Sequence, residues 1–113
     1  MKDTDLKLVL HVGQADRWPA VLSNLNNLTR DYPGASVRVL ANGAGVYAFQ
    51  APNDLRDRIA GFAEGGVTFQ VCANVLREHA VDPNTLPAYA HVVPAGVVAL
   101  AAAQTERFAY VKP

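Results

Sequence analysis

Residues 67–71 read VTFQV and lead directly into Cys72, the only cysteine of the chain. This run of β-branched and aromatic residues predicts a buried strand. Residues 72–80 predict a helix, which places Cys72 where the strand turns into that helix. Just before the strand, Gly65-Gly66 ends another helix, so this stretch has the order helix, strand, helix.

The same alternation extends from this stretch to both ends of the chain. Near-continuous apolar strands separated by helices are typical of a parallel sheet covered on both faces. With right-handed crossovers, we expect one domain over residues 1–113: a three-layer α/β/α sandwich of the flavodoxin-like kind with a mainly parallel five-stranded sheet. Strands are predicted at 6–12, 36–41, 67–71, 91–93 and 108–111, and helices at 16–32, 52–62, 72–80 and 95–107; residues 46–49 fit either a loop or the start of a helical segment.

The charge balance excludes some classes of partner. Ten acidic and ten basic side chains give a net charge of zero, so there is no basic stripe for nucleic acid or an anionic membrane. The longest apolar stretch, residues 95–103, is too short to span a bilayer. The first residues lead into a strand and not into a signal peptide, so we expect a cytoplasmic protein.

The last predicted helix is apolar on every face between residues 95 and 103. Such a pattern is typical of a helix that is buried all round. It fits either a helix packed beneath a loop or a helix inside a subunit interface. With no net charge to oppose association, we favour the interface and expect an oligomer.

Ligands of open parallel sheets bind outside the carboxyl ends of the strands. That rule selects one rim of the predicted sheet without reference to residue type. The candidate site residues on it are Cys72, to which we assign the chemistry, and His11, Asn42, Gly43, Pro94 and Gly96, which we assign to ligand binding.

Cys72 has two interpretations. At the start of a helix, free N–H groups and the positive end of the dipole favour a thiolate, the form that attacks or carries a persulfide. Free cysteines are also among the most buried residues, so an inert core thiol is the alternative. There is no CxxC motif, which excludes an intramolecular disulfide cycle. Ligand spacing for an intrachain metal site is also absent, and we expect no cofactor.

The other rim residues also have structural interpretations. A lone histidine in an apolar strand, such as His11, is more often a satisfied packed residue than a base. The glycines of Asn42-Gly43-Ala44-Gly45 supply a turn, or else let backbone N–H groups approach an anion. The segment has no GK[ST] and is therefore not a Walker loop.

Taken in order, several segments resemble the DsrE/DsrF-like proteins, especially their small single-domain branch. The resemblance implies a flavodoxin-like fold and assembly into trimers or hexamers. It also implies that Cys72 matches the cysteine that carries a persulfide in the sulfur-relay members, which work with dedicated partner proteins. His11, Asn42 and Gly43 match recurrent positions without an established role. The segments that carry the resemblance are His11-Val12, Trp18, Leu22-Ser23-Asn24, Asn27-Leu28, Asn42-Gly43-Ala44-Gly45-Val46, Cys72-Ala73-Asn74-Val75-Leu76, Val92-Val93-Pro94-Ala95-Gly96-Val97, Gln104 and Phe108-Ala109-Tyr110-Val111-Lys112-Pro113.

Three functions follow from these features. In the first, Cys72 accepts a sulfane sulfur from a thiol-bearing donor and passes it to a partner thiol. In the second, the protein is a non-catalytic oligomer that binds a small ligand, a nucleotide or a metal at the strand rim. In the third, Cys72 pairs across an interface in a redox or metal sensor.

Overall fold

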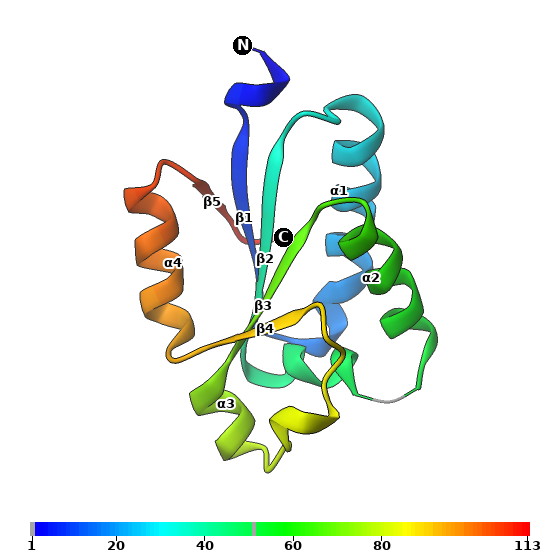
Figure 1. Ribbon diagram of the computed structural model, residues 1–113, viewed down its shortest axis with the longest axis vertical. Coiled ribbons are helices and arrows are strands. Elements are labelled where there is room, and N and C mark those ends of the chain that lie inside the picture. The colour runs from blue at the N-terminus through cyan, green and yellow to red at the C-terminus, as the bar shows by residue number, and fades with distance from the viewer. Residues whose placement is uncertain (1, 51) are drawn as a thin grey trace.

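The computed structural model describes residues 2–50 and 52–113 (Figure 1). Strands and helices alternate along the described chain, as the sequence predicts. The strands are β1 (Lys7–Val12), β2 (Ser36–Ala41), β3 (Thr68–Cys72), β4 (Ala90–Val93) and β5 (Ala109–Val111); the α-helices are α1 (Trp18–Asp31), α2 (Asp54–Glu64), α3 (Ala73–Glu78) and α4 (Gly96–Thr105).

The five strands form one parallel sheet in the order β4-β3-β2-β1-β5. Strands β1 to β4 follow one another across the sheet, and the chain then returns through α4 to the opposite edge, where β5 pairs with β1. Because every strand runs the same way, all five strands end on the same side of the sheet, which we call the carboxyl edge.

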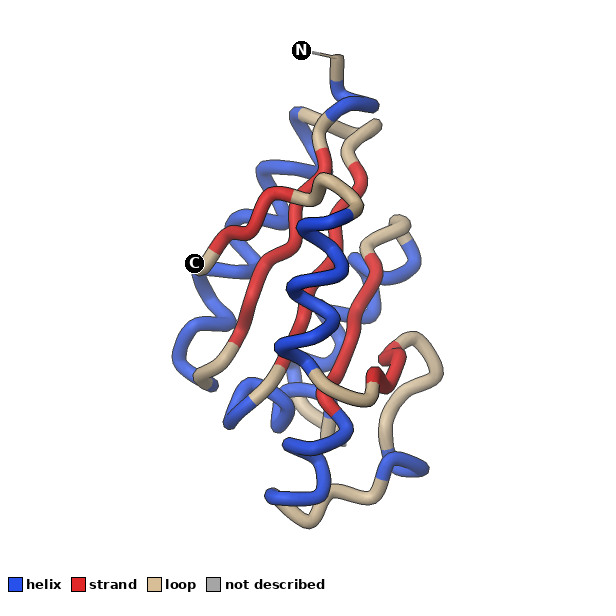
Figure 2. Tube along the Cα trace, turned by 90° about the vertical axis from the view of Figure 1, so that its left-hand side faces the viewer, coloured by secondary structure: helices blue, strands red, loops and turns tan. Residues whose placement is uncertain are grey.

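The helices cover the two faces unequally. Helices α1 and α2 lie on one face, α4 lies on the other, and α3 extends beyond the carboxyl end of β3 (Figure 1). From the side, α4 lies in front of the strands (Figure 2). The predicted three-layer α/β/α sandwich with a parallel five-stranded sheet is therefore confirmed.

The difference between predicted and observed element boundaries that matters for the site is at Cys72. The prediction made it the first residue of a helix, but it is the last residue of β3 and pairs with Val93 of β4. Its backbone is extended (φ −74°, ψ 119°), and α3 begins only at the next residue. The ambiguous residues 46–49 belong to a 3₁₀ segment, Gly43–Phe49.

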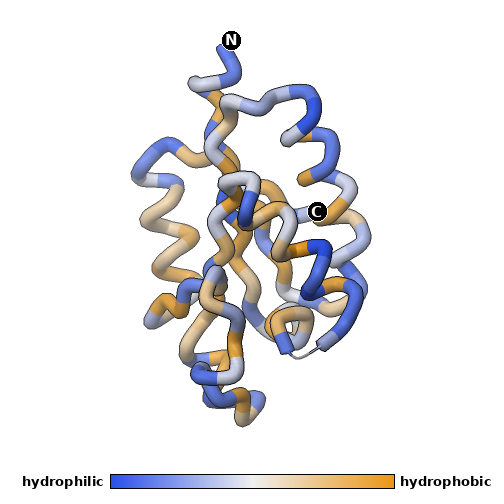
Figure 3. Tube along the Cα trace, turned by 45° about the vertical axis from the view of Figure 1, so that its right-hand side comes forward, coloured by the Kyte–Doolittle hydropathy of each residue, from blue (hydrophilic) through white to orange (hydrophobic). Residues whose placement is uncertain are grey.

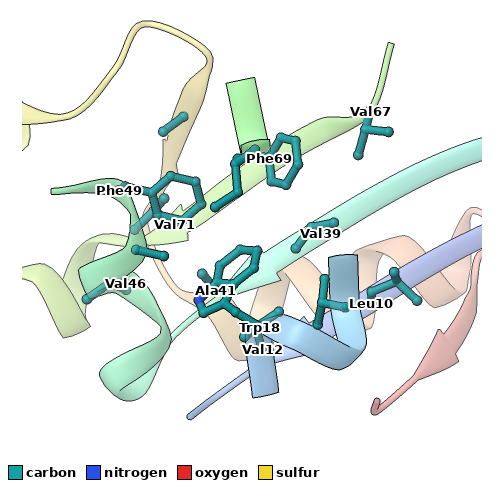
Figure 4. Close-up of a cluster of buried hydrophobic side chains, with 14 of the residues drawn as sticks. Leu10, Val12, Trp18, Val39, Ala41, Val46, Phe49, Val67, Phe69 and Val71 are labelled. Carbon is teal, nitrogen blue, oxygen red and sulfur yellow. The ribbon is translucent and has the colours of Figure 1, made fainter. Parts of the chain in front are cut away.

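The larger core lies between the sheet and the pair α1 and α2 (Figure 4). Trp18, Phe49 and Phe69 are its bulkiest members, and each is fully buried. Trp18 meets Phe49 edge-on with ring centroids 5.6 Å apart, and its indole N–H donates to the carbonyl oxygen of Gly45 at 2.9 Å. This bond ties the first turn of α1 to the loop that follows β2.

The smaller core lies between the sheet and α4, and it shows that α4 is not buried all round. Leu100 and Ala103 of α4 pack on Val9, Leu40 and Phe108. Val97 and Val98 are 73% and 63% exposed, so the described part of the chain leaves this side of α4 uncovered. Apolar positions run along the helix (Figure 3). A helix packed beneath a loop of its own chain is therefore wrong.

Candidate functional site

Cys72 lies at the carboxyl edge of the sheet, as the sequence predicts, with its sulfur turned towards α4. The residue is 5% exposed. Its Sγ accepts a hydrogen bond from the backbone N–H of Gly96, the first residue of α4, at 3.2 Å. The sulfur makes no capping bond to α3. The expected helix N–H group is present, but it belongs to α4 and not to the helix that follows Cys72.

Strand geometry explains this direction. Successive side chains of a strand point to opposite faces, so Cys72 shares its face with Gln70 and Thr68. Those two residues line a cavity against α4, which identifies the α4 side as their face. The preceding Val71 belongs to the larger core on the other side.

Gly96 is a glycine because the sulfur and a leucine lie against its backbone. A Cβ added there would lie 3.2 Å from both Cys72 Cβ and Leu40 Cδ2, and 3.6 Å from Cys72 Sγ. A Cβ at these distances would be a tight contact, so glycine lets the start of α4 approach this closely without displacing its neighbours. Two predicted site residues, 24 positions apart in the sequence, are thus brought into contact.

His11 lies at the same edge with both ring nitrogens engaged. Nε2 lies 2.8 Å from Asn42 Oδ1, and Nδ1 lies 2.6 Å from the Tyr110 hydroxyl. An amide oxygen only accepts, so Nε2 carries the proton, and in the neutral ring Nδ1 accepts from Tyr110. This chain of hydrogen bonds joins the ends of β1, β2 and β5. Sequence reasoning missed Tyr110 because the pairing of β5 with β1 has no local signal.

The strand register places Asn42 beside Cys72. Ala41 pairs with Val71; Asn42 directly follows β2, and Cys72 is the next residue on β3. The backbone of Asn42 remains extended, and its N–H donates to the carbonyl oxygen of Val12 at 3.0 Å, which continues the ladder. His11, Asn42 and Cys72 therefore follow one another along a single edge.

Gly43 and Gly45 shape the turn after β2. Gly43 has a φ of +50°, and a Cβ there would lie 2.5 Å from the carbonyl oxygen of Gly13. At Gly45 the corresponding distance to the carbonyl oxygen of Val12 is 2.3 Å. Both glycines let this turn pack against the end of β1, which is the turn interpretation of the segment.

Pro94 lies between Val93, which pairs with Cys72, and the start of α4. It lines a cavity of about 550 Å³ between α4 and the open face of β2 to β4, together with Gln70, Val98 and Glu106. Glu106 also forms an ion pair with Arg38 at 2.7 Å across this cavity wall. The six predicted residues thus separate into the Cys72–Gly96 contact, the His11–Asn42 pair with its Gly43 turn, and Pro94.

Among the described residues, no three side chains of the types His, Cys, Asp or Glu gather into a group that could hold a metal ion. None of the described helices combines the length and the apolar character needed to cross a membrane.

With this geometry in view, two solved structures resemble the chain over nearly its whole length. One is a protein of unknown function, MTH1491 from Methanobacterium thermoautotrophicum, with a TM-score of 0.90 and 29% identity over 96% of this chain and 100% of that one. The other is the ychN protein from E. coli, with a TM-score of 0.77 and 12% identity over 96% and 99% of the two chains.

Both structures belong to the DsrE/DsrF-like fold family. The chain has the DsrE-like fold. No protein-family model and no curated protein matches the sequence. The fold expected from the resemblance is therefore confirmed, and the sulfur chemistry stays a proposal.

Proposed function

We propose that this chain is a DsrE/DsrF-type sulfur carrier in which Cys72 holds a persulfide. The observation that carries the proposal is the hydrogen bond from Gly96 N–H to Cys72 Sγ at the start of α4. A ten-residue helix presents the positive end of its dipole there, and this favours a negatively charged sulfur. The N–H also offsets part of the cost of placing that charge in a buried site.

The transfer is a thiol–persulfide exchange that needs no external oxidant. The Cys72 thiolate attacks the outer sulfur of a donor persulfide, R–S–S⁻. The donor S–S bond breaks, R–S⁻ leaves as a thiolate, and Cys72 becomes Cys–S–S⁻. A partner thiolate then attacks the outer sulfur, and Cys72 is released as a thiolate. One sulfur atom moves in each step, and the charges balance.

Incubation with inorganic polysulfide should add about 32 Da, the mass of one sulfur atom, to the intact protein. Cys72 is the only cysteine, so Cys72→Ser should show no such adduct. Dithiothreitol should return the wild-type mass to its starting value. Intact-mass spectrometry under non-reducing conditions provides the measurement, and a wild-type protein without the adduct would rule the carrier function out.

The proposal includes self-association in the cytoplasm, as a homotrimer or homohexamer, with a protein thiol as donor or acceptor. The uncovered side of α4 supports it, because Val97 and Val98 expose apolar surface there and the helix carries no charge. A reducing compartment would also keep the lone thiol available.

Light scattering after size exclusion should give three or six times the 12.1 kDa chain mass. Val98→Asp should shift the protein towards the monomer, because burying an unpaired carboxylate in the contact is costly. Tyr32→Asp is the matched control, since Tyr32 is also an exposed apolar side chain but lies at the end of α1. Dissociation by both variants, or by neither, would argue against association through α4.

A further inference from the structure

A second pocket opens at the carboxyl edge of the sheet, beyond β1, and nothing in the proposed sulfur chemistry uses it. Its volume is about 230 Å³, below the roughly 300–1,000 Å³ of pockets for drug-sized ligands. His11, Gly13, Arg17, Asn42 and Lys112 are among the residues that line it. The size favours a small ion over a nucleotide or a larger metabolite.

The charged side chains that line this pocket are all cationic. Arg17 and Lys112 contribute two cations, and no Asp or Glu belongs to its lining. Arg17 Nε donates to a main-chain oxygen of Pro113 at 3.0 Å. Pro113 is the last residue of the sequence and also lines the pocket, so a carboxylate there offsets one of the two positive charges. The terminal nitrogens of Arg17 have no hydrogen-bond partner among the described residues. Lys112 forms no ion pair within the described chain. Lys112 and the terminal nitrogens of Arg17 are thus available to an anion.

Asn42 adds a neutral donor that is held in place. Its Oδ1 accepts from His11 Nε2, and His11 is fixed in turn by Tyr110. The Asn42 amide Nδ2 has no partner within the described residues, and it is not buried. Because Oδ1 already accepts from His11, the Nδ2 group of Asn42 remains as a hydrogen-bond donor.

We propose that this pocket binds a small dianionic oxyanion of the phosphate or sulfate class. Arg17 and Lys112 supply the charge, and the planar guanidinium suits two oxygens of one anion. The Asn42 amide supplies a directional hydrogen bond. The proposal does not depend on Cys72, so binding should be the same in Cys72→Ser.

Isothermal titration at an ionic strength of about 0.1 M, where the Debye length is about 10 Å, tests the proposal with inorganic phosphate and sulfate in separate titrations. We expect saturable binding to the wild type and an increase in Kd of at least about tenfold for Arg17→Gln/Lys112→Gln, because hydrogen bonds to charged groups are lost. The phosphate and sulfate arms identify the preferred anion. Acetate should bind much more weakly than either, since it is a monoanion.

The matched control is Arg58→Gln/Lys2→Gln, which removes the same charge at two exposed positions outside the pocket. It should leave the affinity within about twofold of the wild type, because exposed charges at a distance are largely screened. Absence of binding to the wild type would overturn the proposal. So would an equal loss in the control, or acetate binding as tightly as phosphate.

Discussion

Trp18→Ala should lower the free energy of unfolding by about 3–5 kcal/mol, the usual cost of truncating a buried aromatic side chain to alanine. Trp18 is fully buried, packs edge-on against Phe49, and donates its indole N–H to the carbonyl oxygen of Gly45. Alanine leaves a cavity and removes the partner of a buried carbonyl. With typical stabilities of about 5–15 kcal/mol, this is a large fraction of the total.

Urea denaturation followed by far-UV circular dichroism measures this loss, since Trp18 is the only tryptophan and its fluorescence disappears in the variant. Trp18→Phe separates the two contributions: it keeps most of the packing and should cost about 1–3 kcal/mol for the unpaired carbonyl. Tyr32→Ala, at an exposed aromatic position, should stay within about 0.5 kcal/mol of the wild type. A Trp18→Ala protein as stable as Tyr32→Ala would contradict the described core.

Gly96→Val should destabilise the fold by about 1–3 kcal/mol through overpacking. Its Cβ would lie 3.2 Å from Cys72 Cβ and from Leu40 Cδ2, and valine adds two methyl groups beyond that. Leu40 is fully buried, so moving its side chain disturbs a packed core. The start of α4 must shift, and the backbone N–H of residue 96, which donates to Cys72 Sγ, shifts with it. Polysulfide loading of Cys72 should fall in the same variant.

Gly61→Val is the matched control, because it is the same substitution at a position with open space for the side chain. Gly61 lies in α2, and a Cβ there meets no atom within 4 Å. Replacing a helical glycine should leave stability unchanged or raise it by less than about 1 kcal/mol. Chemical denaturation of both variants gives the comparison, and intact mass after polysulfide gives the second readout. Equal stability of the two variants would show that the α4–Cys72 contact is not close.

The candidate residues lie at the carboxyl ends of the strands, where the sequence places them, and their role as a site stays a prediction. The rule that ligands gather at the carboxyl ends of parallel strands selected His11, Asn42, Cys72 and Gly96, and the structure brings these residues into two hydrogen-bonded pairs. The rule works from strand direction alone, which alternating strands and helices reveal. The rule does not predict which helix begins next to the Cys72 sulfur. That depends on the path of α4, which connects β4 to β5.

Two of the missed residues depend on the position of β5. Tyr110 and Lys112 belong to the last strand and its end, and their place beside His11 and Arg17 follows from the pairing of β5 with β1. In the sequence, β5 is only one more short apolar run. A pattern of hydrophobicity predicts that a strand exists, but it does not state which edge of the sheet the strand joins.

By itself, the sequence determined the alternation of strands and helices, the parallel sheet, and the place of Cys72 at a strand end, since periodicity and turn residues act locally. Only the tertiary structure decided that Cys72 Sγ meets the N–H of Gly96 on α4, and that the basic pocket forms beside β1. Both features join segments that are distant in the chain. Their contact depends on the strand order β4-β3-β2-β1-β5, which is set by the packing of the whole sheet.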